Sequence, residues 1–176
     1  MNKKEFRKKY IEIRHNIVDK DKKSKVIFEK VINSYVYKSS NVIAIYKSLN
    51  SEVDTNSLIE YSLNNKKIVL LPKVVGSDIK FFKYDLGDLL IKSNFGVLEP
   101  VEDYNKYYEK EKIDLVIVPG ISFSRDGSRL GFGKGYYDRF LSESNIETIG
   151  ICFKEQISDV VPTDENDYKL DIVISD

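Results

Sequence analysis

Short and nearly unbroken apolar runs dominate the chain after residue 41, and they constrain its fold more than any other feature. The clearest run is Leu115-Val116-Ile117-Val118, which ends at Pro119-Gly120. A continuous apolar run of this length is typical of a strand that is covered on both faces, as in a parallel sheet. On this criterion the sequence predicts strands at residues 42–46, 68–71, 115–118, 148–153 and 172–175, with residues 79–84 as a further candidate.

Helical patterns precede and separate these runs. Phe6, Tyr10, Ile13 and Ile17 recur at spacings of four, three and four, which indicates an amphipathic helix over residues 3–18. Further helices are predicted at residues 22–37, 57–64 and 136–143. Alternation of strands and helices predicts a three-layer α/β/α fold with a mostly parallel central sheet and a basic helical N-terminus. Because no internal repeat or linker is visible, we expect one domain over residues 1–176.

Charge is distributed unevenly along the chain although the formal net charge is zero. Residues 1–38 carry a net charge of +7, and the remaining residues carry −7. The overall balance argues against a protein that coats nucleic acid by charge alone. The basic segment could be an arm for a polyanion, a wall that faces a phosphate ligand, or a solvated helix face.

The single cysteine, Cys152, cannot form a disulfide within the chain, and its apolar surroundings suggest a core residue. The start Met-Asn-Lys-Lys-Glu lacks the apolar region of a signal peptide. No apolar run approaches the ~20 residues that a membrane-spanning helix needs. We therefore expect a cytoplasmic protein in a reducing compartment with no membrane partner, and its small size favours a monomer.

Ligands of open α/β sheets bind outside the carboxyl ends of the strands. This rule selects three loops, at residues 47–54, 119–135 and 154–171. The second is the most informative, because Gly131, Gly133 and Gly135 alternate directly before a predicted helix and lie among Arg129 and Lys134. Glycines allow close approach of the backbone to an anion, and the basic side chains match a polyphosphate.

Two common phosphate motifs do not fit this loop. A P-loop requires Ser or Thr after the lysine, but Gly135 follows Lys134. A Rossmann fingerprint requires a different glycine spacing immediately after a strand. The loop is therefore predicted to bind phosphates in another way.

The segment Arg129-Leu130-Gly131-Phe132-Gly133-Lys134-Gly135-Tyr136-Tyr137-Asp138-Arg139 closely resembles the glycine–tyrosine motif of 5-formyltetrahydrofolate cyclo-ligases, also called 5,10-methenyltetrahydrofolate synthetases. Further blocks resemble this family in the same order along the chain, at residues 3–7, 46–55, 95–100, 153–156 and 162–171. The resemblance implies a carbon–nitrogen ligase that uses ATP and Mg²⁺. Such a ligase closes 5-formyltetrahydrofolate to 5,10-methenyltetrahydrofolate through an imidate phosphate and releases ADP and phosphate. Phosphoryl transfer of this kind depends on positioning and charge neutralisation, which is consistent with a chain that offers no candidate catalytic histidine.

The resemblance also implies roles for individual residues. Lys134 and Arg129 would stabilise charge during the transfer. The ATP-binding set would be Lys3, Lys4, Arg7, Arg129, Gly131, Gly133, Lys134, Gly135, Tyr136 and Tyr137. The folate-binding set would be Lys47, Glu52, Phe95 and Tyr136, and Asp138 and Asp171 would hold Mg²⁺.

Chemistry supports some of these roles and leaves others open. The Glu52 carboxylate can accept paired hydrogen bonds from the aminopyrimidine edge of a pterin. Phe95 could offer an aromatic face to the folate or could be a core residue. Asp138 could instead favour the first turn of a helix, and Asp171 could simply precede a strand.

Two other classes of function remain possible from the residues alone. One is a different phosphate-binding α/β enzyme, such as a sugar-phosphate isomerase or a relative of the CoA-transferases. The other is a nucleic-acid-binding module that uses the basic helices, although the glycine loop would then have no task. We expect small-molecule substrates and no nucleic-acid partner.

Overall fold

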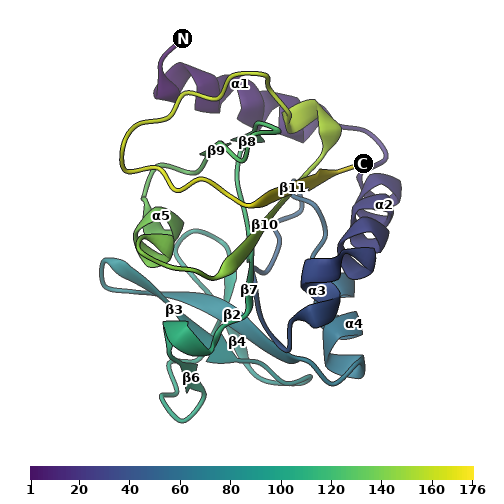
Figure 1. Cartoon of the computed structure of the whole chain (residues 1–176), viewed down its shortest axis with the longest axis vertical. Coiled ribbons are helices and arrows are strands. Elements are labelled where there is room, and N and C mark those ends of the chain that lie inside the picture. The colour runs from purple at the N-terminus through teal and green to yellow at the C-terminus, as the bar shows by residue number, and fades with distance from the viewer.

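A computed structural model describes all 176 residues and shows a mixed α/β architecture around one large sheet (Figure 1). The strands of this sheet follow the order β11-β10-β7-β1-β2-β3-β6. From β11 to β2 all neighbours are parallel, and β3 and β6 are antiparallel additions at one edge. The helices are α1 (Lys3–Asn16), α2 (Lys20–Asn33), α3 (Tyr35–Ser39), α4 (Asn56–Asn64) and α5 (Tyr136–Leu141). The strands of the large sheet are β1 (Val42–Ile45), β2 (Ile68–Val75), β3 (Asp78–Lys83), β6 (Tyr107–Tyr108), β7 (Leu115–Val118), β10 (Glu147–Cys152) and β11 (Ile172–Ser175).

Apolar side chains cover both faces of the central strands, as the unbroken runs predict. Successive residues of a strand point to opposite faces, and all four residues of β7 are fully buried. One face packs against α2, α3 and α4, and the other packs against α5 (Figure 1). The predicted α/β fold with a mostly parallel sheet is therefore confirmed. None of the helices has the length and apolarity needed to cross a membrane.

Helix α1 lies across the carboxyl ends of the strands rather than on a face of the sheet. Its N-terminus is closed by a capping box in which Asn2 and Glu5 bond each other's backbone N–H groups. Phe6 and Tyr10 form a small separate core with Ile121, Leu130 and Val161, which lie in or beside the loops that follow β7 and β10. The amphipathic pattern of α1 therefore anchors it over the loops where a ligand is expected.

The structure differs from the prediction where polar residues or short strands are involved. The predicted helix over residues 22–37 is two helices, because Ser34 adopts an extended conformation and its hydroxyl accepts a hydrogen bond from the Tyr37 N–H at the start of α3. Strand β2 continues past Pro72 to Val75 and pairs with β3 in a hairpin that turns at Gly76. Two small hairpins were not predicted: β4 (Leu90–Lys92) with β5 (Leu98–Pro100), and β8 (Ser122–Phe123) with β9 (Arg129–Leu130).

Candidate active site

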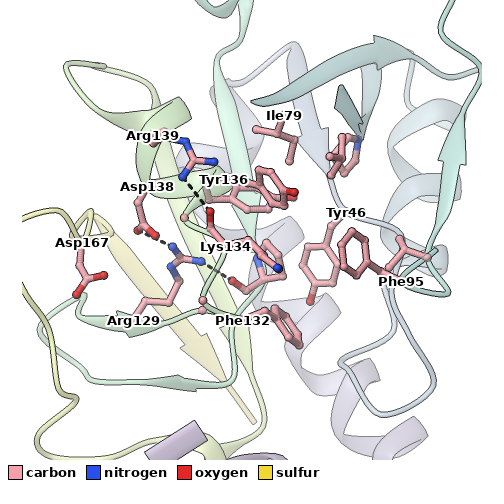
Figure 2. A pocket seen from close by; sticks show the side chains of 18 of the residues that line it. Tyr46, Ile79, Phe95, Arg129, Phe132, Lys134, Tyr136, Asp138, Arg139 and Asp167 are labelled. Carbon is pink, nitrogen blue, oxygen red and sulfur yellow. Dashed lines mark hydrogen bonds and ion pairs between the residues drawn. The ribbon is translucent and has the colours of Figure 1, made fainter. Parts of the chain in front are cut away.

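A cleft of about 680 Å³ opens at the carboxyl ends of β1, β7 and β10. The three loops that the strand order selects all contribute to its lining, from Tyr46 to Glu52, from Pro119 to Arg139 and from Asp164 to Asp167. Helix α1 adds Lys3 and Arg7, and the β4–β5 hairpin adds Phe95 and its neighbours. Arg129, Asp138, Arg139 and Asp167 lie at one side of this cleft, whereas Tyr46 and Phe95 lie at the other (Figure 2).

The glycine loop closes tightly around a side chain of α1. Gly133 and Gly135 have φ angles of +94° and +68°, which favour glycine. The Arg7 Nε donates a hydrogen bond to the Gly131 carbonyl oxygen at 2.9 Å. A Cβ on Gly133 would lie 3.2 Å from Cζ of Arg7, so the arginine also needs this position to be small.

The Arg129 guanidinium is a buried cation beside this loop, held by hydrogen bonds on two of its nitrogens. Its Nη2 donates to Asp138 Oδ1 at 2.6 Å, and its Nη1 donates to the Pro119 carbonyl oxygen at 3.0 Å (Figure 2). Asp138 Oδ1 also accepts a hydrogen bond from the Tyr168 N–H. Arg129 is 5% exposed and its buried Nε has no hydrogen-bond partner. The guanidinium is thus held in place by the protein but retains an unused donor.

Lys134 contrasts with Arg129 because its ammonium group forms no hydrogen bond or ion pair. The residue is exposed and lines the cleft, and Figure 2 shows its side chain extending toward the middle of the cleft. Its carbonyl oxygen accepts a hydrogen bond from Arg139 Nη1 at 2.8 Å, which fixes the backbone. A fixed backbone with a free ammonium group suits a lysine that must meet a ligand.

Tyr136 and Tyr137 lie at the start of α5, directly after the glycine loop. Both line the cleft, and the Arg139 guanidinium lies 5.5 Å from the centre of the Tyr136 ring. Burial raises the pKa of the Tyr137 phenol well above its usual value, so this group is neutral in the native protein. Tyr137 can therefore donate a hydrogen bond but is not a proton acceptor at neutral pH.

Two neighbouring lysines at the start of α1 point in different directions. The Lys3 ammonium group lines the cleft and donates to Asp164 Oδ2 at 2.6 Å and to Asp167 Oδ2 at 2.5 Å. Lys4 is exposed and does not line the cleft. Of the two lysines predicted to bind ATP, the structure therefore brings only Lys3 to the cleft, because the helix turns Lys4 toward solvent.

Glu52 is a buried carboxylate that lines the cleft from the loop after β1. Its Oε2 accepts a hydrogen bond from the Leu49 N–H at 2.8 Å, and its Oε1 lies 3.5 Å from Nη1 of Arg14. Desolvation raises the pKa of Glu52 above its usual value, while the Leu49 N–H and the Arg14 guanidinium oppose that rise. This carboxylate is held in one orientation and is sensitive to the charges around it.

Lys47 and Phe95 also line the cleft on the side of Glu52. Phe95 is 59% exposed, so it is not the core phenylalanine that its sequence context allowed. An exposed ring beside a cleft is available to stack on a planar ligand.

The structure does not bring Asp138 and Asp171 into one site. Asp138 lines the cleft, but Asp171 does not. The Oδ2 of Asp171 accepts hydrogen bonds from the N–H and the hydroxyl of Thr148, so this aspartate joins the ends of β10 and β11. No group of three or more His, Cys, Asp or Glu side chains is arranged to hold a metal ion. Of the two aspartates that the sequence predicts as Mg²⁺ ligands, the structure therefore places only Asp138 in the cleft.

Some residues that line the cleft or contact its lining were not predicted from the sequence. Arg14 shares a helix face with Lys3 and Arg7, so the helical spacing could have suggested it. Asp164 and Asp167 lie in a segment dense in acids, but their contact with Lys3 joins residues more than 160 positions apart. No local pattern in the sequence reveals such a contact.

Fold and site together define an α/β protein with a cleft lined by cations and glycines at the carboxyl ends of parallel strands. A model of the "5-formyltetrahydrofolate cyclo-ligase family" matches residues 1–176. The chain belongs to this family.

Comparisons with individual proteins agree with this assignment. A probable 5-formyltetrahydrofolate cyclo-ligase of Caenorhabditis elegans is 32% identical over 167 residues, which cover 87% of this chain and 81% of the relative. The mouse 5-formyltetrahydrofolate cyclo-ligase is 31% identical, with coverage of 87% and 82%. The solved structure of an Aquifex aeolicus 5,10-methenyltetrahydrofolate synthetase has a TM-score of 0.86 and 32% identity, and covers 99% of this chain and 89% of its own. A Mycoplasma pneumoniae synthetase has a TM-score of 0.78 at 27% identity, with 99% coverage of both chains.

Proposed function

We propose that this chain closes 5-formyltetrahydrofolate to 5,10-methenyltetrahydrofolate at the expense of ATP. The formyl oxygen attacks the γ-phosphorus, the bond from this phosphorus to the β,γ-bridging oxygen breaks, and ADP leaves. N10 of the folate then attacks the activated formyl carbon, loses its proton, and displaces inorganic phosphate. Both steps require close positioning and charge stabilisation more than acid–base catalysis.

The observation that carries the proposal is that one cleft joins two chemically different halves. The phosphate half consists of residues 129–138 with Lys3 and Arg7, and the folate half consists of Tyr46, Lys47, Glu52 and Phe95. Cations and glycine amides suit a polyphosphate, and a buried carboxylate beside exposed aromatic surface suits a pterin. A cleft of about 680 Å³ falls within the usual size for ligand sites.

Roles within the phosphate half follow from how each cation is held. Arg129 is fixed by Asp138 and Pro119 and offers a preorganised charge, whereas Lys134 is free to follow the transferring phosphoryl group. Lys3, Arg7, the glycines and the two tyrosines at the start of α5 would enclose the rest of ATP. A preorganised charge lowers the barrier without reorganisation during the reaction.

Asp138 fits the Mg²⁺ that the family resemblance implies. Only its Oδ1 is used by Arg129 and Tyr168, so Oδ2 is available beside the phosphate half. Mg²⁺ is usually held by one or two carboxylates together with phosphate oxygens and water. When bound, the ion would neutralise phosphate charge.

The residues that line the cleft come from both ends of the chain, with Lys3 the first and Asp167 the last. This supports one catalytic domain over residues 1–176. This domain would act on small molecules as a cytoplasmic monomer.

One assay tests the proposed reaction. Purified protein is mixed with 5-formyltetrahydrofolate, ATP and Mg²⁺, and the ultraviolet absorbance of 5,10-methenyltetrahydrofolate is followed. We expect product that depends on ATP and is accompanied by an equal amount of inorganic phosphate. Folded protein that forms no product, or product without phosphate release, would refute the proposed function.

A further inference from the structure

We propose that Arg14 is a positioning residue for the folate half of the cleft. Its guanidinium holds the Glu52 carboxylate in its charged form and in one orientation. This inference rests on the proposed function, because it assigns Glu52 to folate binding. Arg14 itself does not line the cleft, so it acts through Glu52 and not by contact with the substrate.

The contacts of Arg14 are unusual for an arginine that only supports the fold. The residue is 3% exposed, yet its Nε and Nη1 have no hydrogen-bond partner. Buried polar groups are almost always hydrogen-bonded, and leaving donors unused costs free energy. The remaining interactions of the guanidinium are with Glu52 Oε1 at 3.5 Å and with the face of Phe132, whose ring centre lies 5.4 Å away. Both of these residues line the cleft.

Helix α1 places this charge independently of the loop that carries Glu52. Three basic residues on one side of the helix each engage a different loop: Lys3 binds Asp164 and Asp167, Arg7 binds Gly131, and Arg14 pairs with Glu52. The helix itself is anchored by Phe6 and Tyr10. Arg14 therefore keeps its position whether or not the loop after β1 is bound to substrate.

The charges that face Glu52 make this carboxylate dependent on Arg14. The phenols of Tyr46, directly after β1, and of Tyr137, in α5, face it, and burial raises the pKa of each, so both are neutral at neutral pH. Desolvation favours the protonated form of Glu52, and Arg14 is the one charged group that opposes it. Without Arg14 the pKa of Glu52 would rise further, because a buried carboxylate without a cation takes up a proton more readily.

Substitution Arg14→Met tests this role, with Arg14→Lys as the matched variant that retains the charge. The dissociation constants of 5-formyltetrahydrofolate and of a non-hydrolysable ATP analogue are measured separately by calorimetry over a range of pH, and thermal unfolding verifies the fold. At a pH below the midpoints of both chains we expect Arg14→Met to weaken folate binding about tenfold, since a shift of one pKa unit changes the ionised fraction tenfold there. Binding of the ATP analogue should change less than about twofold.

The pH profile separates positioning from simple loss of packing. For the native chain, folate binding should weaken as the pH falls through the pKa of Glu52. In Arg14→Met this midpoint should move to higher pH by about one unit or more, and in Arg14→Lys it should stay within about half a unit of the native value. In a Glu52→Gln background, where no carboxylate titrates, Arg14→Met should add less than about a twofold loss.

Each outcome decides the inference. An unchanged midpoint in Arg14→Met, or an equal loss of folate and ATP-analogue binding, overturns it. If Arg14→Met does not fold, Arg14→Lys decides, because a loss of folate binding that is the same at every pH contradicts a role through charge. Failure of the native chain to bind 5-formyltetrahydrofolate would instead refute the proposed function.

Discussion

In the phosphate half of the cleft, Lys3 and Arg129 are each paired with aspartates, whereas in the folate half the buried charge is the Glu52 carboxylate with Arg14 behind it. The first half presents cations that the protein has already oriented, and the second presents an anion that the protein must keep ionised. Lys134 is the exception in the first half, because it has no partner. The phosphate half therefore contains both fixed and free cations. Removing the free cation should lower activity with little effect on stability, whereas breaking the pair of a fixed cation should lower stability as well.

The largest effect should come from the free cation. We expect Lys134→Ala to lower kcat by about a thousandfold, since removing one group that stabilises transition-state charge has effects of this size. The free energy of unfolding should stay within about 0.5 kcal/mol of the native value, because the side chain is exposed and unpaired. Steady-state kinetics and urea unfolding measure the two quantities. Lys8→Ala, at an exposed position of α1 outside the cleft, is the control and should change neither.

Breaking the fixed pair should affect stability as well as activity. In Asp138→Ala the buried Arg129 charge loses its partner, and we expect the free energy of unfolding to fall by about 3 kcal/mol. Asp126→Ala is the matched control, because Asp126 pairs with Lys169 at the surface and both side chains are more than half exposed. Its loss should be below about 1 kcal/mol. Equal losses in urea unfolding would contradict the view that Arg129 depends on Asp138.

The folate half should respond to the loss of one charge without loss of shape. Glu52→Gln retains an acceptor for the Leu49 N–H but removes the negative charge, so we expect folate to bind about tenfold more weakly. Binding of ATP should change less than about twofold, because Glu52 lies in the other half. Calorimetry with each ligand measures the ratio. An equal effect on both ligands would show that the halves do not act separately.

The sequence predicts most of the fold because its strands are apolar on both faces. The predicted bounds of β7 and β11 agree with the structure residue for residue, and the burial of all four residues of β7 leaves no alternation to misread. The interruption between α2 and α3 at Ser34 is harder to predict than these strands. Serine also occurs within helices, and it acts as a cap only where the backbone leaves the helical conformation. Hairpin β8–β9 has strands of two residues, too short for any periodic pattern.

The site is predicted less completely because its charges are paired over long distances in the chain. The glycine loop is visible locally, since its glycines and basic residues lie within a few positions of one another. The partners of Arg14 and Lys3 come from loops that only the fold brings to α1. Asp171 is the opposite case, because the sequence predicts it as a site residue and the structure places it outside the cleft. Its position before β11 lets it accept a hydrogen bond from Thr148.

Lys3 and Lys4 provide the smallest and most local test of the comparison. Adjacent residues of a helix are separated by about 100° of rotation, so Lys3 faces the cleft and Lys4 faces solvent. We expect Lys3→Ala to raise the KM for ATP about fivefold, partly because Asp164 and Asp167 would then repel the phosphates. Lys4→Ala should change it less than about twofold.

Salt dependence indicates which part of the Lys3 effect is electrostatic. Repulsion between partly exposed carboxylates and phosphates is screened at high ionic strength, so the difference between Lys3→Ala and the native chain should shrink as salt is added. The effect of Glu52→Gln on folate binding should be less sensitive, because burial shields that carboxylate from mobile ions. If Lys4→Ala raised the KM for ATP as much as Lys3→Ala, the basic segment would act as a diffuse field around the cleft, and the paired cations of the phosphate half would lose their distinct role.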